Sequence, residues 1–193
     1  VFFETYWGNP LTSDLARSVR QINSGSIFVF GSTNDGSIGG FNYALHKLDR
    51  YGNLIWTRYF GSVYDDNGLY MNKTNDGNLI LAGESQSNFD GLDVLIFKVD
   101  TNGVEIWNRR YSSPVNESVK YVEPTSDKGY ILTGFQNDTS ASNNIYVLKI
   151  DSAGNIQWEK SLGGIDNEYA NQVRELPGKN YVVTGDTRSF GAG

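Results

Sequence analysis

The feature that most constrains this chain is a repeat of 51 residues, marked by three residue types that return at the same step. These residues are Trp56, Trp107 and Trp158; Asp49, Asp100 and Asp151; and Lys47, Lys98 and Lys149. A period this strict in several residue types indicates one supersecondary unit copied along the chain. The sequence therefore predicts a single repeat domain over residues 1–193, with three full copies and two partial ones. The copies are 1–7, 8–56, 57–107, 108–158 and 159–193.

Each full copy contains four short segments with the pattern of strands, separated by turns rich in Gly, Asn and Asp. The second segment of every copy ends at a Gly, and these are Gly31, Gly83, Gly134 and Gly185. The second and third segments are apolar at both alternating positions, which is typical of strands covered on both faces. Antiparallel four-stranded sheets of this kind stack radially as the blades of a β-propeller. We therefore predict an all-β fold that is either a β-propeller or an open arc of one.

Composition excludes several classes of function. The chain has no Cys, so disulfides, thiolate chemistry and Cys-ligated metal sites are excluded. His46 is the only histidine, which excludes multi-histidine metal sites, and its place in a third segment favours a half-buried packing position. The net charge is -6 and Lys and Arg are scattered, so we expect no nucleic-acid partner. No apolar run reaches the roughly 18 residues of a membrane helix, and we expect no membrane span, metal or cofactor.

The run K-x-D-x-x-G-x-x-x-W, preceded in the third copy by GYILTG at 129–134, resembles the propeller-type repeats of secreted and surface proteins of bacteria, notably Bacteroidetes. The resemblance covers essentially the whole chain. It implies export from the cell and a binding or structural role. Quinoprotein dehydrogenases have a distantly similar Asp, Gly and Trp turn in each blade, but the stacking groups and metal-binding carboxylate that a quinone needs are not assignable here.

The repeated residues have structural interpretations. A Trp is large, apolar and has one N–H, which suits a side chain wedged between neighbouring blades that donates to one carbonyl. The Asp opens a turn, where its carboxylate can accept backbone N–H groups. The Lys lies two residues earlier on the same face of the strand, so we expect its stem to cover apolar surface and its ammonium to reach a carboxylate.

A second acidic column lies in the loop that enters each first strand, and its members are Asp14, Asp66, Glu117 and Glu168. In a propeller this loop lies on the same face as the loop between the second and third strands. That face would also carry Asn34, Asp35, Asp90, Asp93, Asn137 and Asp138. A ring of acids there would bind a cation or a basic peptide. The alternative is that these side chains form turn-stabilising hydrogen bonds at a solvated rim.

The partial copies leave the ends of the array incomplete. Residues 159–193 lack a third and a fourth strand, and residues 1–7 align with the last strand of a preceding blade. One interpretation is a larger ring that continues in the rest of a larger polypeptide. The other is an open arc whose edge strands pair with a second copy or another partner.

These observations favour a non-catalytic binding or scaffold module of an exported or cell-surface protein. Its loop-rich face would engage a protein or a glycan ligand. The alternative is a propeller enzyme, either a quinone-dependent oxidoreductase or a polysaccharide-active hydrolase or lyase. The sequence assigns no catalytic residues for either reaction.

Overall fold

The computed structural model describes residues 11–22, 25–35, 38–87, 91–137 and 142–190. In these residues the chain forms 14 β-strands and no helix, so no helix has the length and apolar character that crossing a bilayer requires. The first sheet contains β1 (Asp14–Ile22), β2 (Ser26–Thr33), β3 (Asn42–Asp49) and β4 (Leu54–Phe60). The second contains β5 (Asp66–Lys73), β6 (Leu79–Ser87), β7 (Gly91–Val99) and β8 (Glu105–Tyr111). The third contains β9 (Glu117–Pro124), β10 (Tyr130–Asn137), β11 (Asn143–Ile150) and β12 (Ile156–Leu162). The fourth contains β13 (Glu168–Leu176) and β14 (Asn180–Thr187).

Within each sheet the strands follow the order of the sequence, and every pair is antiparallel. The all-β prediction with four strands in each full copy is therefore confirmed. The fourth strands, expected to end at the repeated Trp, continue to Phe60, Tyr111 and Leu162. They do so because the residues after the Trp pair with the start of the third strand, as Phe60 pairs with Tyr43. Residues 1–7, expected as the last strand of a preceding blade, lie outside the described residues.

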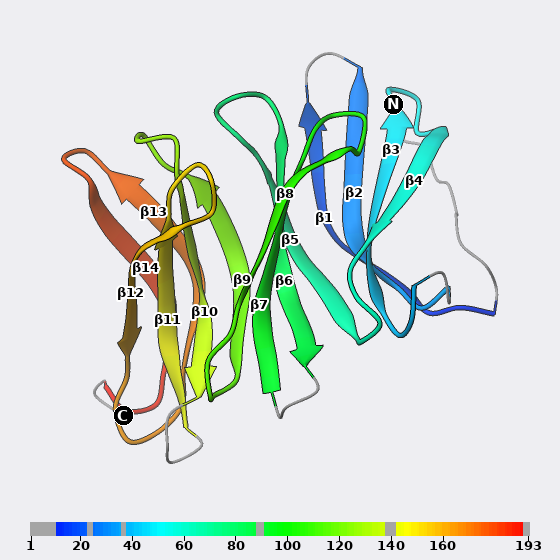
Figure 1. Cartoon of the computed structure of the whole chain (residues 1–193). Helices are drawn as coiled ribbons and strands as arrows, with labels where there is room; N and C mark the ends of the chain where they lie inside the picture. Colours follow the sequence, from blue (N-terminus) through cyan, green and yellow to red (C-terminus); the bar gives the residue numbers. More distant parts are fainter. Residues whose placement is uncertain (1–10, 23–24, 36–37, 88–90, 138–141, 191–193) are drawn as a thin grey trace.

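The sheets stand in a row (Figure 1), and apolar side chains are buried between neighbouring sheets. In the second sheet, Leu79 and Leu81 of β6 pack against the first sheet, whereas Ile80 and Ala82 pack against the third. Successive side chains of a strand point to opposite faces, so a strand with a sheet on each side must be apolar at every position. This explains why the second and third segments of each copy lack a polar face. Each Leu or Ile of this kind contributes about 1.5–3 kcal/mol when fully buried.

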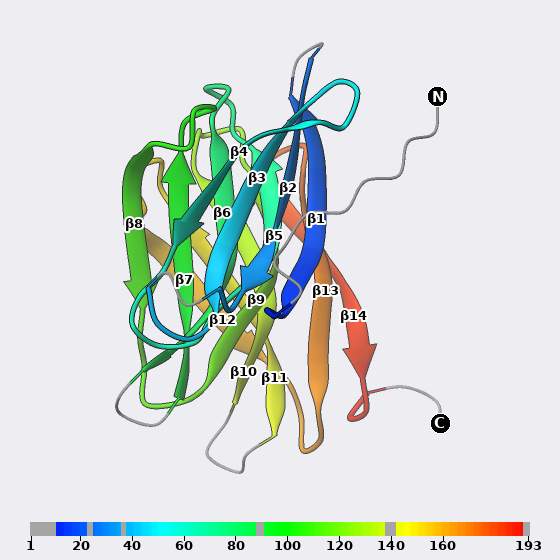
Figure 2. The ribbon, with the colours of Figure 1, turned by 90° about the vertical axis from the view of Figure 1, so that its right-hand side faces the viewer.

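The first strand of each later sheet lies against the first two strands of the sheet before it. Strand β5 contacts β1 and β2, β9 contacts β5 and β6, and β13 contacts β9 and β10. Figure 2 shows β1 and β13 along one side of the molecule and β8 on the opposite side. The series is open, because no comparable contact joins the first sheet to the fourth in the described part of the chain.

A β-bulge interrupts every first strand opposite the periodic Gly. In β9 the bulge places Lys120 outside the ladder, between Val119 and Tyr121, which pair with Gly134 and Thr133. A Cβ at Gly134 would collide with the carbonyl oxygen of Ser118. The same collision is met at the other periodic glycines, which are Gly31, Gly83 and Gly185. The repeat therefore contains Gly at this position because the bulged backbone passes too close for a side chain.

Two of the repeated Trp side chains, Trp56 and Trp107, lie against the turn of the following sheet, and Trp158 packs against Tyr181 of β14. The indole N–H of Trp107 donates to the carbonyl of Ser152 at 3.2 Å, and a Cβ at Gly154 would lie 3.2 Å from the same ring. In the same way a Cβ at Gly103 would lie 2.9 Å from Trp56. The turn glycines also have positive φ, at 76° for Gly103 and 83° for Gly154. The Gly and the Trp of the repeat thus belong to one contact between consecutive sheets.

The repeated Asp residues stabilise the turns that contain these glycines. The carboxylate of each Asp accepts the backbone N–H groups of the residues two and four positions later, and this holds for Asp49, Asp100 and Asp151.

The repeated Lys side chains are partly or fully buried and reach fixed acceptors. Lys98 pairs with Asp76 at 2.6 Å and Lys149 pairs with Asp127 at 2.9 Å. Lys47 donates instead to a backbone carbonyl in the turn between β7 and β8, 2.9 Å away. Partial burial raises the pKa of Asp76 and of Asp127, but hydrogen bonds from the Lys and from a nearby Thr outweigh it. The pKa of each carboxyl is therefore lowered to about 2.

Candidate functional site

The four acids of the second acidic column do not form an exposed ring. Asp66, Glu117 and Glu168 keep only 0%, 3% and 1% of their surface exposed, and only Asp14 among the four lies open to solvent. Each buried acid begins the first strand of a sheet, beneath the loop that arrives from the preceding sheet. The expectation of a carboxylate ring for a cation or a basic peptide is therefore wrong for three of its four members.

The buried carboxylates instead hold the loops around them. The backbone N–H of Ser62 donates to Asp66, in the loop that joins the first sheet to the second. Glu168 accepts the N–H of Gly164 at 2.9 Å and the N–H of Ser189 at 3.0 Å. Hydrogen bonds from Ser189 and Gly164 stabilise the ionised form and lower the pKa of Glu168 to about 2. These acids tie together loops that would otherwise leave backbone donors unpaired.

Glu117 differs electrostatically from Glu168. It accepts hydrogen bonds from the Ser113 hydroxyl and from Gln136 Nε2, the latter at 2.8 Å. Its other oxygen has no hydrogen-bond partner among the described residues. Burial raises the pKa of Glu117 above its ordinary value, the two hydrogen bonds offset part of the rise, and the negative charge of Asp93 adds to it. The junction between the second and third sheets therefore contains a carboxylate that is costly to ionise.

A further polar column just before these acids was missed by sequence reasoning. Its side-chain oxygens accept the backbone N–H near the start of the preceding sheet's third strand, with a donor–acceptor distance of 2.8 Å in all three copies. Its members are Asp65, Asn116 and Asn167, which accept from Phe41, Leu92 and Asn143. The signal was available, because these residues also recur every 51 positions.

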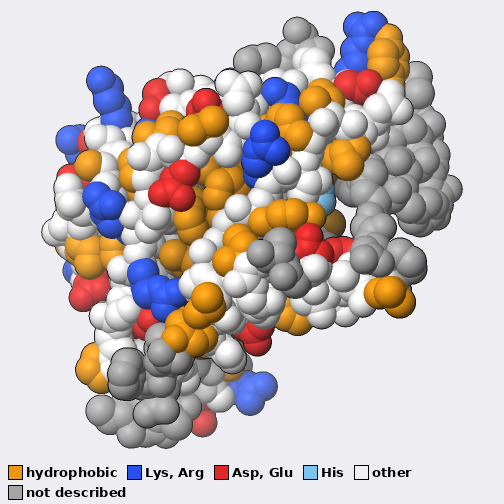
Figure 3. Space-filling model, turned by 45° about the vertical axis from the view of Figure 1, so that its right-hand side comes forward, with side chains coloured by type: hydrophobic (Ala, Val, Ile, Leu, Met, Phe, Trp, Pro, Cys, Tyr) orange, Lys and Arg blue, Asp and Glu red, His pale blue; other side chains and the backbone are white. Residues whose placement is uncertain are grey.

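The remaining predicted binding residues do not converge. Asn34 is exposed and accepts the N–H of Ser13 at 2.6 Å, and Asp35 is half-buried. Asn137 is half-buried and donates to Asn143 at 2.8 Å. Figure 3 shows acidic, basic and apolar side chains interspersed over one face of the molecule rather than gathered in an acidic patch. Two of the predicted residues lie outside the described residues: Asp90 and Asp138.

Asp93 is buried at the start of β7 and is held within the protein. Ser112 donates to its carboxylate at 2.9 Å, and Arg110 pairs with it at 3.5 Å. Arg110 also lies 4.0 Å from Asp66. This Arg therefore faces two buried acids, and it lies nearer to Asp93 than to Asp66.

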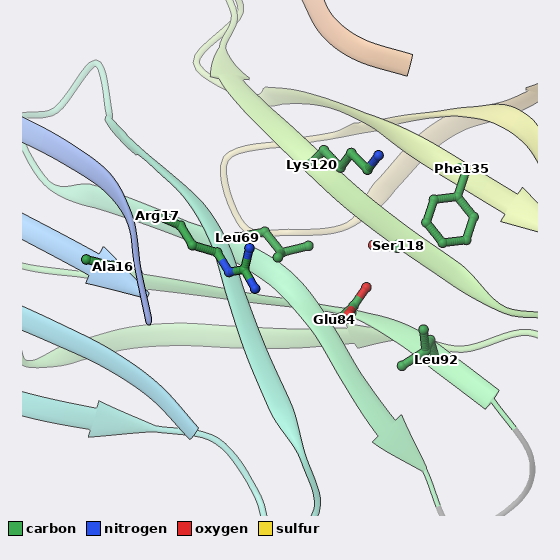
Figure 4. A pocket seen from close by; sticks show the side chains of 8 residues that line it. All are labelled: Ala16, Arg17, Leu69, Glu84, Leu92, Ser118, Lys120 and Phe135. Carbon is green, nitrogen blue, oxygen red and sulfur yellow. The ribbon is translucent and has the colours of Figure 1, made fainter. Parts of the chain in front are cut away.

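The structure places a different set of residues together, in a groove of about 660 Å³ between the first strands (Figure 4). We call it the inner-strand groove. Strands β1 and β9 each contribute two lining residues, and β5, β6, β7 and β10 contribute one each. The lining residues are Ala16, Arg17, Leu69, Glu84, Leu92, Ser118, Lys120 and Phe135.

Three charged side chains of the groove are uncommitted. Within the described part of the chain, Arg17 and Glu84 make no side-chain hydrogen bond or ion pair. The ammonium of Lys120 lies 5.2 Å from the centroid of the Tyr169 ring, its one aromatic contact there. Arg17 and Lys120 are exposed, and Glu84 is half-buried. Such groups remain available for a ligand, unlike the paired acids of the loops.

The walls between these charges are apolar. Leu69, Leu92 and Phe135 line the groove, and all three are half-buried. Phe135 packs edge-on against Tyr169, with ring centroids 5.7 Å apart, so its position is fixed. A cleft with apolar walls and a few separated polar groups is typical of a ligand site.

Comparison of the sequence with protein-family models and with curated proteins finds no match. The case for the inner-strand groove therefore depends on geometry alone. Sequence reasoning did not find the groove because its central residues occupy the same place in each repeat, the bulge of the first strand, but differ in residue type. Three of them are the extra residues of the bulges, Arg17, Leu69 and Lys120, and the fourth bulge contains Asn171.

Two smaller hollows are less suited to a ligand. One, of about 420 Å³, contains Asp76 and Lys98, which already pair with each other. The other, of about 310 Å³, lies between the outer strands of the first two sheets.

His46 is half-buried and its Nδ1 lies 2.9 Å from the Thr57 hydroxyl, and burial lowers its pKa. In the described residues no three His, Asp or Glu side chains come together as metal ligands.

Proposed function

We propose that this chain is an arc of a β-propeller and acts as a non-catalytic binding module whose ligand occupies the inner-strand groove. The observation that carries the proposal is the grouping of Arg17, Lys120 and Glu84, which lack ion-pair partners in the described residues, around apolar walls. The buried acids Asp66 and Glu168, in contrast, accept hydrogen bonds from backbone N–H groups of the fold. The proposal moves the ligand from the loop-rich face to the groove between the first strands.

The propeller arc is supported by how the sheets are arranged. The first strands lie together and the second and third sheets are covered on both faces, as radial stacking requires. Val182 on β14 is 43% exposed, whereas its counterparts Phe28, Ile80 and Ile131 are fully buried by the sheet that follows each. A further sheet, from the rest of a larger polypeptide or from a second copy, would bury Val182 in the same way.

Binding is favoured over catalysis by the composition of the groove. Its lining contains a single carboxylate, Glu84. Hydrolysis of a glycoside generally uses two carboxyl groups placed on either side of the bond that breaks. One carboxylate and two cations, which come from three different strands, instead provide separate polar contacts for a ligand.

The test is to apply the protein to an array of glycans and peptides and to compare it with the double variant Arg17→Ala/Lys120→Ala. We expect the wild type to retain ligands that the double variant loses. The matched control is Lys73→Ala/Lys160→Ala, which removes two exposed cations from β5 and β12 outside the groove and should leave binding unchanged. Equal binding by all three proteins would overturn the proposal.

The resemblance to secreted bacterial repeats extends this proposal to location. We propose that the module works outside the cell or at its surface, where a glycan or protein ligand is accessible. Fractionation of producing cells, followed by detection of the chain in the surface and culture fractions, tests this. Recovery of the protein only from the cell interior would contradict it.

A further inference from the structure

We infer that the inner-strand groove binds an acidic sugar, with Arg17 and Lys120 recognising the carboxylates of its uronic-acid units. The inference rests on the proposed function, because it names the ligand class of the same groove. Three independent features of the lining carry it: its cations, its single carboxylate with apolar walls, and the shape of its edge strands.

The cations select an anion. The chain has a net charge of -6, yet two of its 16 basic residues line one groove from different sheets. In the described residues neither forms an ion pair, so a bound anion would not have to displace a protein carboxylate. A guanidinium presents a planar fork of donors that matches a carboxylate, and an ammonium adds a second charge.

Glu84 and the apolar walls indicate which groups the ligand has besides its carboxylate. An ionised carboxylate only accepts hydrogen bonds, so Glu84 would bind hydroxyl or amino groups that the ligand donates. It also disfavours a ligand made only of phosphates, which it would repel. Leu69 and Phe135 provide surfaces for an apolar ring face. A uronic acid has a carboxylate, several hydroxyls and an apolar face of ring C–H groups within one unit.

The edge strands disfavour an extended peptide. A peptide that adds to a sheet edge needs a regular row of N–H and C=O groups. Strands β1, β5 and β9 lie at the edges of their sheets, but each is interrupted by a bulge at the groove, at Arg17, Leu69 and Lys120. Bulges break this row and re-aim the side chain, as natural proteins do to block strand addition. The groove therefore suits a ligand recognised by side chains.

The experiment measures binding of trigalacturonic acid by calorimetry at low ionic strength, with its fully methyl-esterified form as the uncharged match. We expect the acid to bind and the ester to bind about tenfold or more weakly, because it lacks the charge that Arg17 and Lys120 recognise. Arg17→Ala and Lys120→Ala should each weaken binding of the acid about tenfold, and Lys160→Ala should not. Arg17→Glu should abolish it.

The outcomes separate the two proposals. If neither sugar binds but a neutral glycan or an acidic peptide binds in a way that Arg17→Ala/Lys120→Ala abolishes, the acidic-sugar inference fails and the binding module stands. If the acid binds all variants equally, the attraction is not localised to the groove and the inference fails. If no ligand class shows groove-dependent binding, both proposals fail. Circular dichroism of each variant verifies that the exposed substitutions leave the sheets intact.

Discussion

Single residues of the repeat act at the contacts between strands and between sheets. The periodic Gly is required where the bulged first strand pairs with the second strand. The turn Gly is required where the Trp of the preceding sheet packs against the turn. The buried acids close the loops between sheets. Each of these residues can be tested by a substitution that changes one contact.

Gly134→Ala should destabilise the protein strongly. The new Cβ would collide with the carbonyl oxygen of Ser118, which is backbone and cannot move aside. We expect the free energy of unfolding to fall by about 3 kcal/mol, the upper range for overpacking. Urea denaturation measures it. Gly25→Ala is the matched control, because a Cβ there meets nothing within 4 Å, and an equal loss in both variants would contradict this account.

Glu117→Gln should stabilise the protein at neutral pH. The wild-type carboxylate is buried near Asp93 with one oxygen unpaired, and burial raises its pKa. A group with a raised native pKa is destabilising when ionised, so this penalty disappears as the pH falls through that pKa. The amide is neutral at every pH. We expect a gain of about 1 kcal/mol in the free energy of unfolding at pH 7 that shrinks in acid.

Glu168→Gln is the natural comparison for that measurement. The pKa of Glu168 is lowered rather than raised, since its carboxylate accepts several hydrogen bonds. This substitution should lower stability at neutral pH. A loss of stability in both variants would show that Glu117 is needed as an anion.

Between elements, buried ion pairs tie a turn to a strand within one sheet. Lys149 on β11 reaches Asp127 in the turn between β9 and β10, and Lys98 on β7 reaches Asp76 in the corresponding turn. The Lys side chains are almost fully buried, while the acids remain partly exposed. Solvent screening therefore limits what each pair contributes to stability.

These pairs predict a loss of stability in strong acid. Asp76 and Asp127 have native pKa values of about 2, below the ordinary value of 3.8. A lowered native pKa contributes stability that is present above 3.8 and is lost as the pH falls through about 2. We expect the urea midpoint to fall over this interval. Asp127→Asn should be less stable at neutral pH and should show a shallower fall, and an unchanged acid profile would contradict the role of this pair.

For the whole molecule, the open series of sheets predicts uneven stability. The second and third sheets are covered on both faces, whereas β14 has a free edge in the described residues and an outer face with Val182 exposed. Amides of β14 should exchange with solvent hydrogen much faster than those of β10, its counterpart in the third sheet. Hydrogen-exchange mass spectrometry measures both. Equal protection would mean that a second copy or another segment already covers β14.

The sequence was sufficient to predict the sheets but not the groove. The Trp and Asp columns and the doubly apolar strands follow from contacts that repeat, so a period reveals them. Arg17, Leu69 and Lys120 differ in residue type, so a search for one residue type at a fixed spacing does not find them. The acids were assigned to an exposed rim because the sequence does not show that partners such as Gln136 and Arg110, from other strands, would turn them inward.

In the proposed binding module, the bulge in each first strand separates the hydrogen-bonded framework from the residue that would contact a ligand. A residue outside the ladder can change its chemistry while the hydrogen-bonded framework stays as it is, so positions 17, 69, 120 and 171 can evolve independently of stability. Duplication of one unit then adds one more freely variable recognition position. A library randomised at these four sites would sample many specificities on one unchanged scaffold.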